Sequence, residues 1–547
     1  MSLKNNPKQV IPSMNLEQSP VSNTFKHAMI YSLATIMGKA IGFIMLPVYA
    51  HYLRGEGYGI IGMIDVVISV VTILIGYGIQ GAMTRLYYER ETEKKRHRLI
   101  STAIVLMFFA VVLTGVPVML FDRQIAWLAF GQEGLSNYIF LAILTFMVDM
   151  TAKNAETFIL IQQKSIFYVF LSLCRLLLAF SLNIYFIVHL KLGVLGYLYS
   201  GLIVAMVFTL VMHIYCLGRV GIHYDRGDAS EILRYSLPLI PGYVAMFIRT
   251  NINRILLRTF LNLTHVGAFE MIFKFATLVG LFVVEPFSKI WGVKRFEIAE
   301  DPNAPKTMAS VFTMILGVML FVGLVLSVEI PVLLKLLTPQ EFWLDGGVAA
   351  LAVLSLIILA SYYHFYFGLL YAKKTKEISI IQIATTFVGL ILSLILVRSF
   401  GIYGAVVASC FTNLFQCIMA FFMARGYYRI PFQWHRITVL MLSYGVFFMI
   451  INQVSPSTTP SWNGWLKETI APWLVNFIHV FHLETFKDGQ FAIWAVERFG
   501  LLVDGLVKFA LSLLFFFVLI PGKYISRHRL AAAVRTKSFA PLFSQKR

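Results

Sequence analysis

The sequence predicts an all-α polytopic membrane protein with about fourteen transmembrane helices. Of its 547 residues, 58% are hydrophobic and only 13% are charged, whereas soluble domains carry about 25% charged residues. Apolar runs of about 20 residues, long enough to cross the hydrocarbon core of a bilayer, recur along most of the chain. Lysine and arginine gather in alternate connecting segments, which is the distribution that membrane insertion imposes.

The chain begins with a polar segment, residues 1–26, that lacks the pattern of a cleavable signal peptide and is predicted to be a flexible cytoplasmic tail. Apolar periodicity then predicts the membrane spans, with ends defined to within a few residues. The fourteen spans are 28–50, 58–82, 99–121, 138–161, 166–190, 194–217, 237–260, 266–292, 308–330, 348–371, 379–397, 402–424, 437–454 and 499–520.

The basic residues orient these spans. With both termini in the cytoplasm, the inner segments hold 29 of the 46 lysines and arginines, the outer segments hold 8 and the spans hold 9. The most basic connection, Arg85–Arg98, is interpreted as a solvated inner loop. The formal net charge of +19 therefore reflects topology and indicates contact with anionic phospholipids, not nucleic acid.

An internal repeat divides the chain. Gly59, Met63 and Ile64 match residues 267, 271 and 272, which are also Gly, Met and Ile, at a constant offset of 208. Together with the matched order of spans, this repeat predicts two six-helix lobes around a central cleft, plus two extra C-terminal helices. The predicted domains are an N-lobe (27–217), a cytoplasmic linker (218–236), a C-lobe (237–425), the added helices in 437–520 with an outer amphipathic loop (455–498), and a basic cytoplasmic tail (521–547).

The seventh span, within Leu237–Leu261, carries Arg249, Arg254 and Arg258. At about 1.5 Å per residue, Arg249 lies roughly 18 Å from Leu237, just beyond the middle of a hydrocarbon core about 30 Å thick. Arginine is costly in lipid, so this helix is expected to line a polar space.

Other spans also carry charges, several of them at i,i+3 or i,i+4 spacing, where neighbours can neutralise each other. These sets are Asp149/Lys153/Glu156, Glu270/Lys274, Glu285/Lys289 and Asp504/Lys508. The remainder is cationic: Lys39, Arg175, Arg249, Arg254 and Arg258 against Asp65 and Glu329. A cationic site in a low-dielectric region attracts anions, and arginine grips phosphate oxygens with a bidentate fork.

We therefore expect an anionic substrate. The predicted substrate-binding residues are Lys39, Lys153, Arg175, Arg249, Arg254, Arg258 and Lys274. The predicted ion-coupling residues are Asp65, Asp149, Glu156 and Glu270. Asp65 has no charged neighbour within one helical turn and is expected to bind a proton or a sodium ion, or to pair with Lys39.

Two stretches carry a family resemblance. GKAIGFIMLPVYAHYLRGEGYGIIGMIDVVISVVTILIGYGIQGAMTRLYYER and LPLIPGYVAMFIRTNINRILLRTFLNLTHVGAFEMIFKF resemble matching helix pairs of the polysaccharide-transport flippases, and the similarity covers about residues 28–425. The resemblance implies a Wzx-like oligosaccharide flippase of the multidrug/oligosaccharidyl-lipid/polysaccharide (MOP) superfamily. The family often has Asp-Arg in the seventh span, where this chain has Asn253-Arg254, which leaves Arg254 without a neighbouring acid.

The resemblance implies that an undecaprenyl-pyrophosphate-linked oligosaccharide, such as an O-antigen, capsule or exopolysaccharide repeat unit, crosses the bacterial inner membrane by alternating access. It also implies a polysaccharide polymerase and a chain-length regulator as partners. No Walker loop, HExxH or nucleophile elbow is present, and the four cysteines lack metal-ligand spacing, so no enzyme activity, metal or cofactor is expected. The alternatives are an antiporter of drugs or metabolites on the same fold, and a membrane polysaccharide polymerase or ligase.

Overall fold

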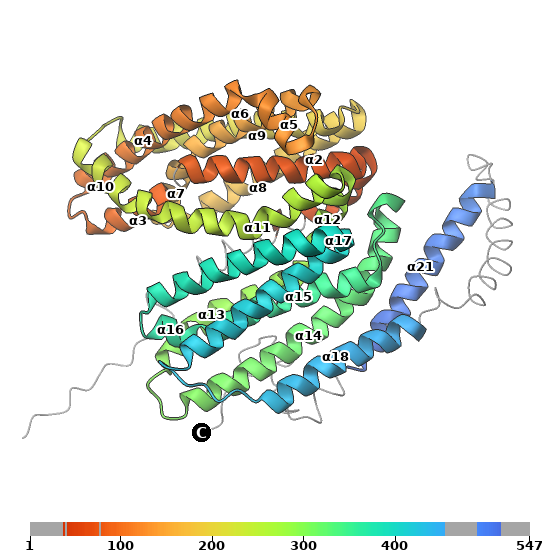
Figure 1. Ribbon diagram of the computed structural model, residues 1–547. Helices are drawn as coiled ribbons and strands as arrows, with labels where there is room; N and C mark the ends of the chain where they lie inside the picture. The colour runs from red at the N-terminus through yellow and green to blue at the C-terminus, as the bar shows by residue number, and fades with distance from the viewer. Residues whose placement is uncertain (1–36, 39–40, 76–77, 455–488, 516–547) are drawn as a thin grey trace, which may run out of the picture. The chain divides into compact units, whose positions relative to one another are not determined.

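The computed structural model describes residues 37–38, 41–75, 78–454 and 489–515, and in these ranges every regular element is a helix (Figure 1). Lys39, both terminal tails and most of the predicted outer loop 455–498 lie outside the described residues. The all-α fold class is confirmed. Helices are expected here because a span in lipid must satisfy its own backbone hydrogen bonds.

The chain divides into two compact units. Unit 1 comprises the described residues of Met1–Val48, Val71–Asp122 and Ser136–Ile240. Its helices are α3 (Gly78–Glu89), α4 (Glu93–Leu120), α6 (Ser136–Thr151), α7 (Lys153–Ile161), α8 (Ser165–Asn183), a π-helical turn (Ile184–His189), α9 (Gly193–Val220) and α10 (Arg226–Ser236). Helices α4, α6 and α9 pack against one another in this unit.

Unit 2 comprises the described residues of Tyr49–Val70, Arg123–Leu135 and Pro241–Arg547. Besides the middle of α2 (Leu46–Ile75), its helices are α5 (Asp122–Phe130), α11 (Ile240–Phe260), α12 (Leu263–Ala276), α13 (Glu285–Glu297), α14 (Ala304–Leu337), α15 (Gly346–Phe365), α16 (Phe367–Tyr371), α17 (Thr375–Ala424), α18 (Trp434–Val454) and α21 (Gly489–Leu513). Helix α14 lies at its centre, between α15 on one side and α18 and α21 on the other (Figure 1).

Where the structure describes them, the predicted spans fall on helices. Ten helical runs among the described residues are long and apolar enough to cross a membrane. Two of them contain an internal turn, at Arg54 in α2 and at Gly401 in α17, so each joins parts of two predicted spans. Helix α11 is not among the ten, because its arginines and asparagines lower its hydropathy.

Unusual backbone angles recur at the same spacing in the two halves, at positions where the sequences show no match. Gln163 and Lys373 both have positive φ, 55° and 57°, and both precede a long helix, α8 and α17. Lys191 and Gly401 also have positive φ, 53° and 58°, and each lies 28 residues further along. Both pairs are separated by 210 residues, so the fifth and eleventh predicted spans begin and end with the same turns. This geometry supports the predicted internal repeat.

Matched glycines of the repeat also contact each other's helices directly within unit 2, where α2 crosses α12. A Cβ on Gly59 would lie 1.8 Å from the carbonyl oxygen of Leu263, and a Cβ on Gly267 would lie 2.2 Å from the carbonyl oxygen of Gly55. Residues 55 and 263 are themselves separated by the repeat offset of 208. Small residues allow such close approach between helices in a bilayer, where packing replaces the hydrophobic effect as the main attraction.

Two short helices, α5 and α10, were not predicted, because each lies in a connecting segment and is too short to cross a membrane. The sequence of α10 does carry a start signal. Asp225 precedes it and accepts a hydrogen bond from the backbone N–H of Asp228 at 2.9 Å, which is the usual N-cap geometry.

The glycine crossing yields a prediction for Gly59→Ala. The added methyl group would collide with backbone, which cannot rotate away, so the helices must separate at a cost of about 1–3 kcal/mol. We expect a lower melting temperature of the purified protein in detergent. Gly445→Ala in α18 is the control, because nothing lies within 4 Å of its Cβ position and alanine favours helix. Equal melting of Gly59→Ala and the wild type would contradict the crossing.

Candidate functional site

Helix α11 brings three arginines into unit 2, and each has a different kind of partner. The helix follows a 3₁₀ turn, Leu237–Leu239, in which proline occupies an early position, as is common where a helix starts. Arg249, Arg254 and Arg258 are all half-buried along its second half. Their partners therefore decide which of them carries charge available to a ligand.

Arg254 is neutralised by Glu270 of α12. Its Nε and Nη2 atoms both donate to this carboxylate, the second at 2.9 Å, and its Nη1 donates to Asn251 Oδ1 at 3.0 Å. Such a bidentate pair is the strong form of the ion pair. The expectation that Arg254 lacks an acid is wrong, because the acid comes from the next helix and not from position 253.

Lys274 follows Glu270 by one turn, but the ion pair that this spacing allows is not formed. The Lys274 ammonium instead donates to the Tyr58 hydroxyl of α2 at 3.2 Å, and Glu270 points to Arg254. Asp65 of α2 lies within electrostatic range of all three charged groups. We call Asp65, Arg254, Glu270 and Lys274 the four-charge cluster. It has two positive and two negative charges, so the predicted cationic excess is smaller here than the sequence indicates.

Arg249 has amide partners only. Its Nη1 donates to Gln382 Oε1 at 3.0 Å and its Nη2 donates to Asn413 Oδ1 at 3.3 Å, both from α17. Gln382 and Asn413 are absent from the predicted site, although polar amides inside the apolar runs 379–397 and 402–424 were a signal for them. No carboxylate in the described part of the chain forms an ion pair with Arg249.

Arg258 contacts a helix end. Its Nη2 donates to the backbone carbonyl of Trp127 at 3.1 Å, in the last turn of α5, where the negative end of the helix dipole favours a cation. Gly131 follows α5 with φ +81°, and a Cβ there would lie 2.4 Å from the same guanidinium nitrogen. A side chain at this position would thus displace the arginine. Arg258 fixes α5 to α11.

The charges of the fourth and fifth spans form a second group, in unit 1. Lys153 lies 3.5 Å from Asp149 and 3.0 Å from Glu156, so the predicted set is confirmed. Arg175 was expected to be unpaired, but its Nη2 donates to Asp149 at 2.5 Å. Two cations and two acids again balance. The pair Asp504/Lys508 in α21 is also formed, at 2.9 Å.

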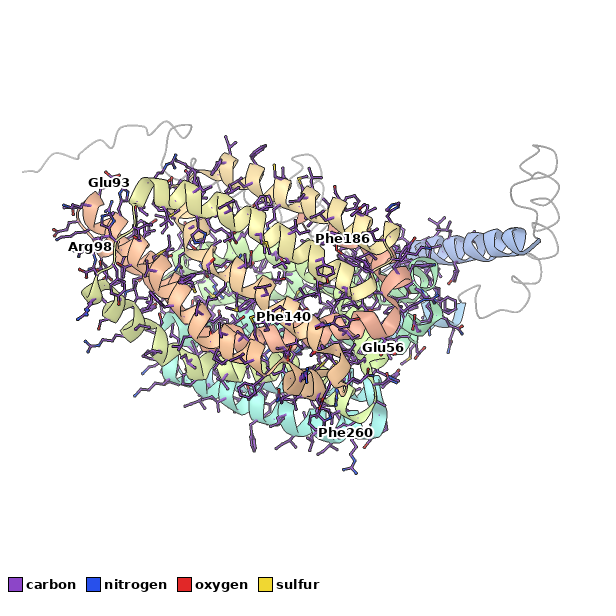
Figure 2. All side chains as sticks on the ribbon, turned by 90° about the horizontal axis from the view of Figure 1, so that it is seen from above. Glu56, Glu93, Arg98, Phe140, Phe186 and Phe260 are labelled. Carbon is purple, nitrogen blue, oxygen red and sulfur yellow. The ribbon has the colours of Figure 1, made fainter. Side chains whose placement is uncertain are left out.

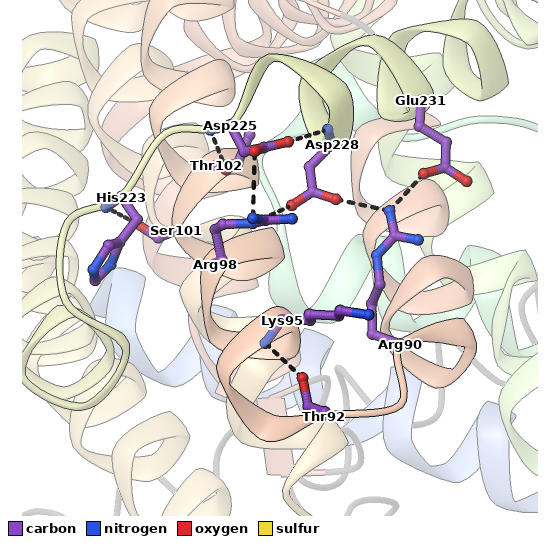
Figure 3. Close-up of polar contacts among 10 residues, drawn as sticks. All are labelled: Arg90, Thr92, Lys95, Arg98, Ser101, Thr102, His223, Asp225, Asp228 and Glu231. Atoms are coloured by element: carbon purple, nitrogen blue, oxygen red, sulfur yellow. Dashed lines mark hydrogen bonds and ion pairs between the residues drawn. The ribbon is translucent and has the colours of Figure 1, made fainter.

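The basic connection Arg85–Arg98 is not simply solvated. Arg90 Nη2 donates to Asp228 at 2.7 Å and to Glu231 at 2.5 Å, and Arg98 Nε donates to Asp228 at 3.2 Å (Figure 3). Hydrogen bonding to Glu231 raises the pKa of Arg90 above its ordinary value. These ion pairs join the start of α4 to α10.

The same cluster fixes the chain just before α10. The hydroxyls of Ser101 and Thr102 accept hydrogen bonds from the backbone N–H groups of His223 and Asp225 (Figure 3). The N–H of Asp228 holds the pKa of the Asp225 carboxyl below its ordinary value. In unit 1, Glu93 and Arg98 lie at one end of the helices and Phe186 lies toward the other (Figure 2), so this charged cluster lies at one end of the unit.

Residues 24–291 match the family model "Polysaccharide biosynthesis protein". No curated protein sequence matches significantly. A structure of the lipid II flippase MurJ in an inward closed conformation matches with a TM-score of 0.65 at 13% identity, covering 90% of this chain and 98% of that one.

An inward-facing multidrug resistance MATE transporter of the MOP superfamily matches with a TM-score of 0.55 at 16% identity, covering 76% of this chain and 99% of that one. At these identities the structures show the fold alone. With the family match, they confirm the predicted resemblance to the MOP superfamily. The chain is a multi-pass membrane protein with the fold of flippases and transporters.

The pair between Arg254 and Glu270 yields a prediction for leucine substitutions. Either Arg254→Leu or Glu270→Leu leaves one half-buried charge without its partner, and we expect each to lower the free energy of unfolding by about 3 kcal/mol. The double variant removes both charges and is expected to recover part of that loss. Thermal unfolding in detergent measures this coupling. Strictly additive losses would show that the two residues do not stabilise each other.

Proposed function

We propose that this protein is a flippase that moves an undecaprenyl-pyrophosphate-linked oligosaccharide across the bacterial inner membrane. The match to a polysaccharide biosynthesis family and the fold shared with a lipid II flippase support this function. The observation that carries it is α11, which places three arginines among polar partners inside a membrane-spanning bundle. Arginines in such a place suit a polyanionic lipid headgroup.

The proposed cycle is alternating access between the lobes 27–217 and 237–425. The proposed substrate-binding residues remain Arg249 and Arg258 of the C-lobe, with Lys39, Lys153 and Arg175 of the N-lobe. Arg254 and Lys274 act through the four-charge cluster. Because Arg254 is paired with Glu270, and Lys153 and Arg175 with Asp149, these three contribute to anion binding only when their pairing changes.

The four-charge cluster supplies a route for coupling. With Asp65 ionised its net charge is zero, and a proton or sodium ion on Asp65 leaves it at +1. A positive cluster attracts an anion more strongly, and by linkage the bound anion favours the loaded Asp65. Ion and substrate would then bind together, with Glu270 as the fixed partner of Arg254. Asp149 and Glu156 are the corresponding acids of unit 1, beside Lys153 and Arg175.

An antiporter of drugs or metabolites is the second candidate, and the fold of the MATE transporter favours it. An exporter of organic cations would require an acidic site, whereas the two charge groups of α2, α11, α12 and of α6–α8 are balanced and Arg249 adds a positive charge. A polymerase or ligase on the outer face would draw its catalytic residues from 455–498. The carrier-linked glycan remains the best fit.

We expect purified protein in lipid vesicles to flip an undecaprenyl-pyrophosphate oligosaccharide, and Arg249→Ala to reduce the rate at least tenfold, since one charged hydrogen bond to phosphate is worth about 1.5–3 kcal/mol. Asp65→Asn is expected to remove the response to an imposed ion gradient. Protection of the glycan from an added enzyme measures flipping. Wild-type vesicles that flip no lipid-linked glycan would exclude the proposed function, and an unchanged gradient response in Asp65→Asn would exclude the coupling role.

The orientation gives a separate prediction. If both termini are cytoplasmic, Lys94 faces the cytoplasm and Glu133 faces outward. Both side chains are exposed. Single cysteines at these positions should react with a membrane-impermeant label from opposite sides of sealed inner-membrane vesicles. Labelling of both from the same side would overturn this topology.

The proposed contacts with anionic phospholipids, the polymerase and the chain-length regulator depend on the same orientation.

A further inference from the structure

Arg249 and Arg254 lie five residues apart on α11, yet their electrostatic situations are opposite. Arg254 faces a carboxylate through two parallel hydrogen bonds. Arg249 faces two neutral amides, and no carboxylate among the described residues forms an ion pair with it. A neutral amide orients a guanidinium and satisfies part of its hydrogen bonding without cancelling its charge. Arg249 is therefore fixed in place and still carries its full positive charge.

The two amides are themselves held so that their oxygens face Arg249. Gln382 Nε2 lies 3.4 Å from the Tyr362 hydroxyl, and Asn413 Nδ2 donates to the Ser355 carbonyl at 2.9 Å. A guanidinium has only donors, so the amide oxygens must point toward it. Each amide thus has one end anchored on α15 and the other on Arg249. This arrangement leaves three of the five guanidinium N–H groups without an assigned acceptor in the described structure.

Further polar groups extend from this point along the same helix. Gln416 follows Asn413 by one turn and is fully buried, and neither of its side-chain amide atoms has a hydrogen-bond partner in the described part of the chain. The hydroxyl of Thr385, one turn after Gln382, is likewise buried and unpaired there. Tyr362 stacks on Tyr366 with ring centroids 4.7 Å apart. Buried polar atoms without a hydrogen-bond partner in the described part of the chain therefore lie one helical turn from each of the two amides that hold Arg249.

We propose that Arg249 is the primary anion-binding residue of α11 and that Gln382 and Asn413 are positioning residues that keep its charge uncompensated. The ligand is the anionic group of the substrate, a phosphate of the lipid carrier or a carboxylate of an acidic sugar. Arg254, neutralised by Glu270, is not the primary anion site. This inference rests on the proposed function for its substrate, but anion binding itself tests it.

The substitution Gln382→Glu separates this role from a purely structural one. It changes neither size nor shape and places a carboxylate where an amide oxygen lies 3.0 Å from Arg249. If Arg249 binds the anionic ligand, this internal counter-ion competes with it. If Arg249 only ties α11 to α17, the new ion pair strengthens the tie. The two roles thus predict different anion binding after one isosteric change: binding is weakened if Arg249 holds the anion and is unchanged if it does not. Asn413→Asp repeats the test from the other amide.

The experiment measures binding of inorganic pyrophosphate and of glucuronate to the full-length protein in detergent by calorimetry, together with its melting temperature and glycan flipping in vesicles. We expect the wild type to bind at least one anion, and Gln382→Glu and Asn413→Asp to weaken that binding at least tenfold without lowering the melting temperature. Which anion binds distinguishes the carrier phosphate from an acidic sugar. Gln162→Glu is the matched control, since Gln162 also accepts from an arginine, Arg219, at 3.4 Å, and it should bind as the wild type does.

Wild-type protein that binds neither anion would overturn the inference. So would a Gln382→Glu variant that melts at a higher temperature, binds as tightly as the wild type and still flips glycan. If the wild type binds pyrophosphate and Gln382→Glu does not, but no lipid-linked glycan is flipped, the anion site stands and the proposed function fails.

Discussion

A charge that the bilayer encloses is costly without a partner, because an isolated ion in hydrocarbon costs about 2.5 kcal/mol or more. This constraint organises both units. In unit 2 the pair Arg254–Glu270 joins α11 to α12, and in unit 1 Arg175 and Lys153 surround Asp149. Once these pairs are made, few charges remain for a ligand. Arg249 stands apart because its partners are amides, which orient it without neutralising it.

Charge compensation also differs between the three arginines of α11. The partner of Arg258 is the carbonyl end of α5. This contact holds a connecting segment against α11. The partner of Arg254 is Glu270, which shares the four-charge cluster with Asp65. A proton or a cation on Asp65 would change the net charge of this cluster. The partners of Arg249 leave its charge intact. Three turns of α11 thus carry a structural contact at Arg258, a charge balanced by an acid at Arg254 and an uncompensated charge at Arg249.

The fold class, the positions of the spans and the polar character of α11 could be predicted from the sequence, because hydropathy and the positive-inside rule act over whole segments. The ion-pair partners of the charged residues could not be predicted in this way. Glu270 was assigned to Lys274 by spacing, but contacts between helices decided in favour of Arg254. Arg90 was assigned to a solvated loop, although Asp228, 138 residues away, pairs with it. Spacing describes one helix at a time, whereas partners are chosen between helices.

The crossing of α2 and α12 explains where the sequence repeat survived. Gly59 and Gly267 each approach the backbone of the other helix, so neither position can gain a side chain unless both helices move apart. The residues one turn further, Met63 and Met271, are both buried beside the crossing. The sequences of the two halves can differ wherever each half packs only against itself. At this crossing, the residues of each half pack against the other half. The matched residues therefore lie where the two helices restrict each other.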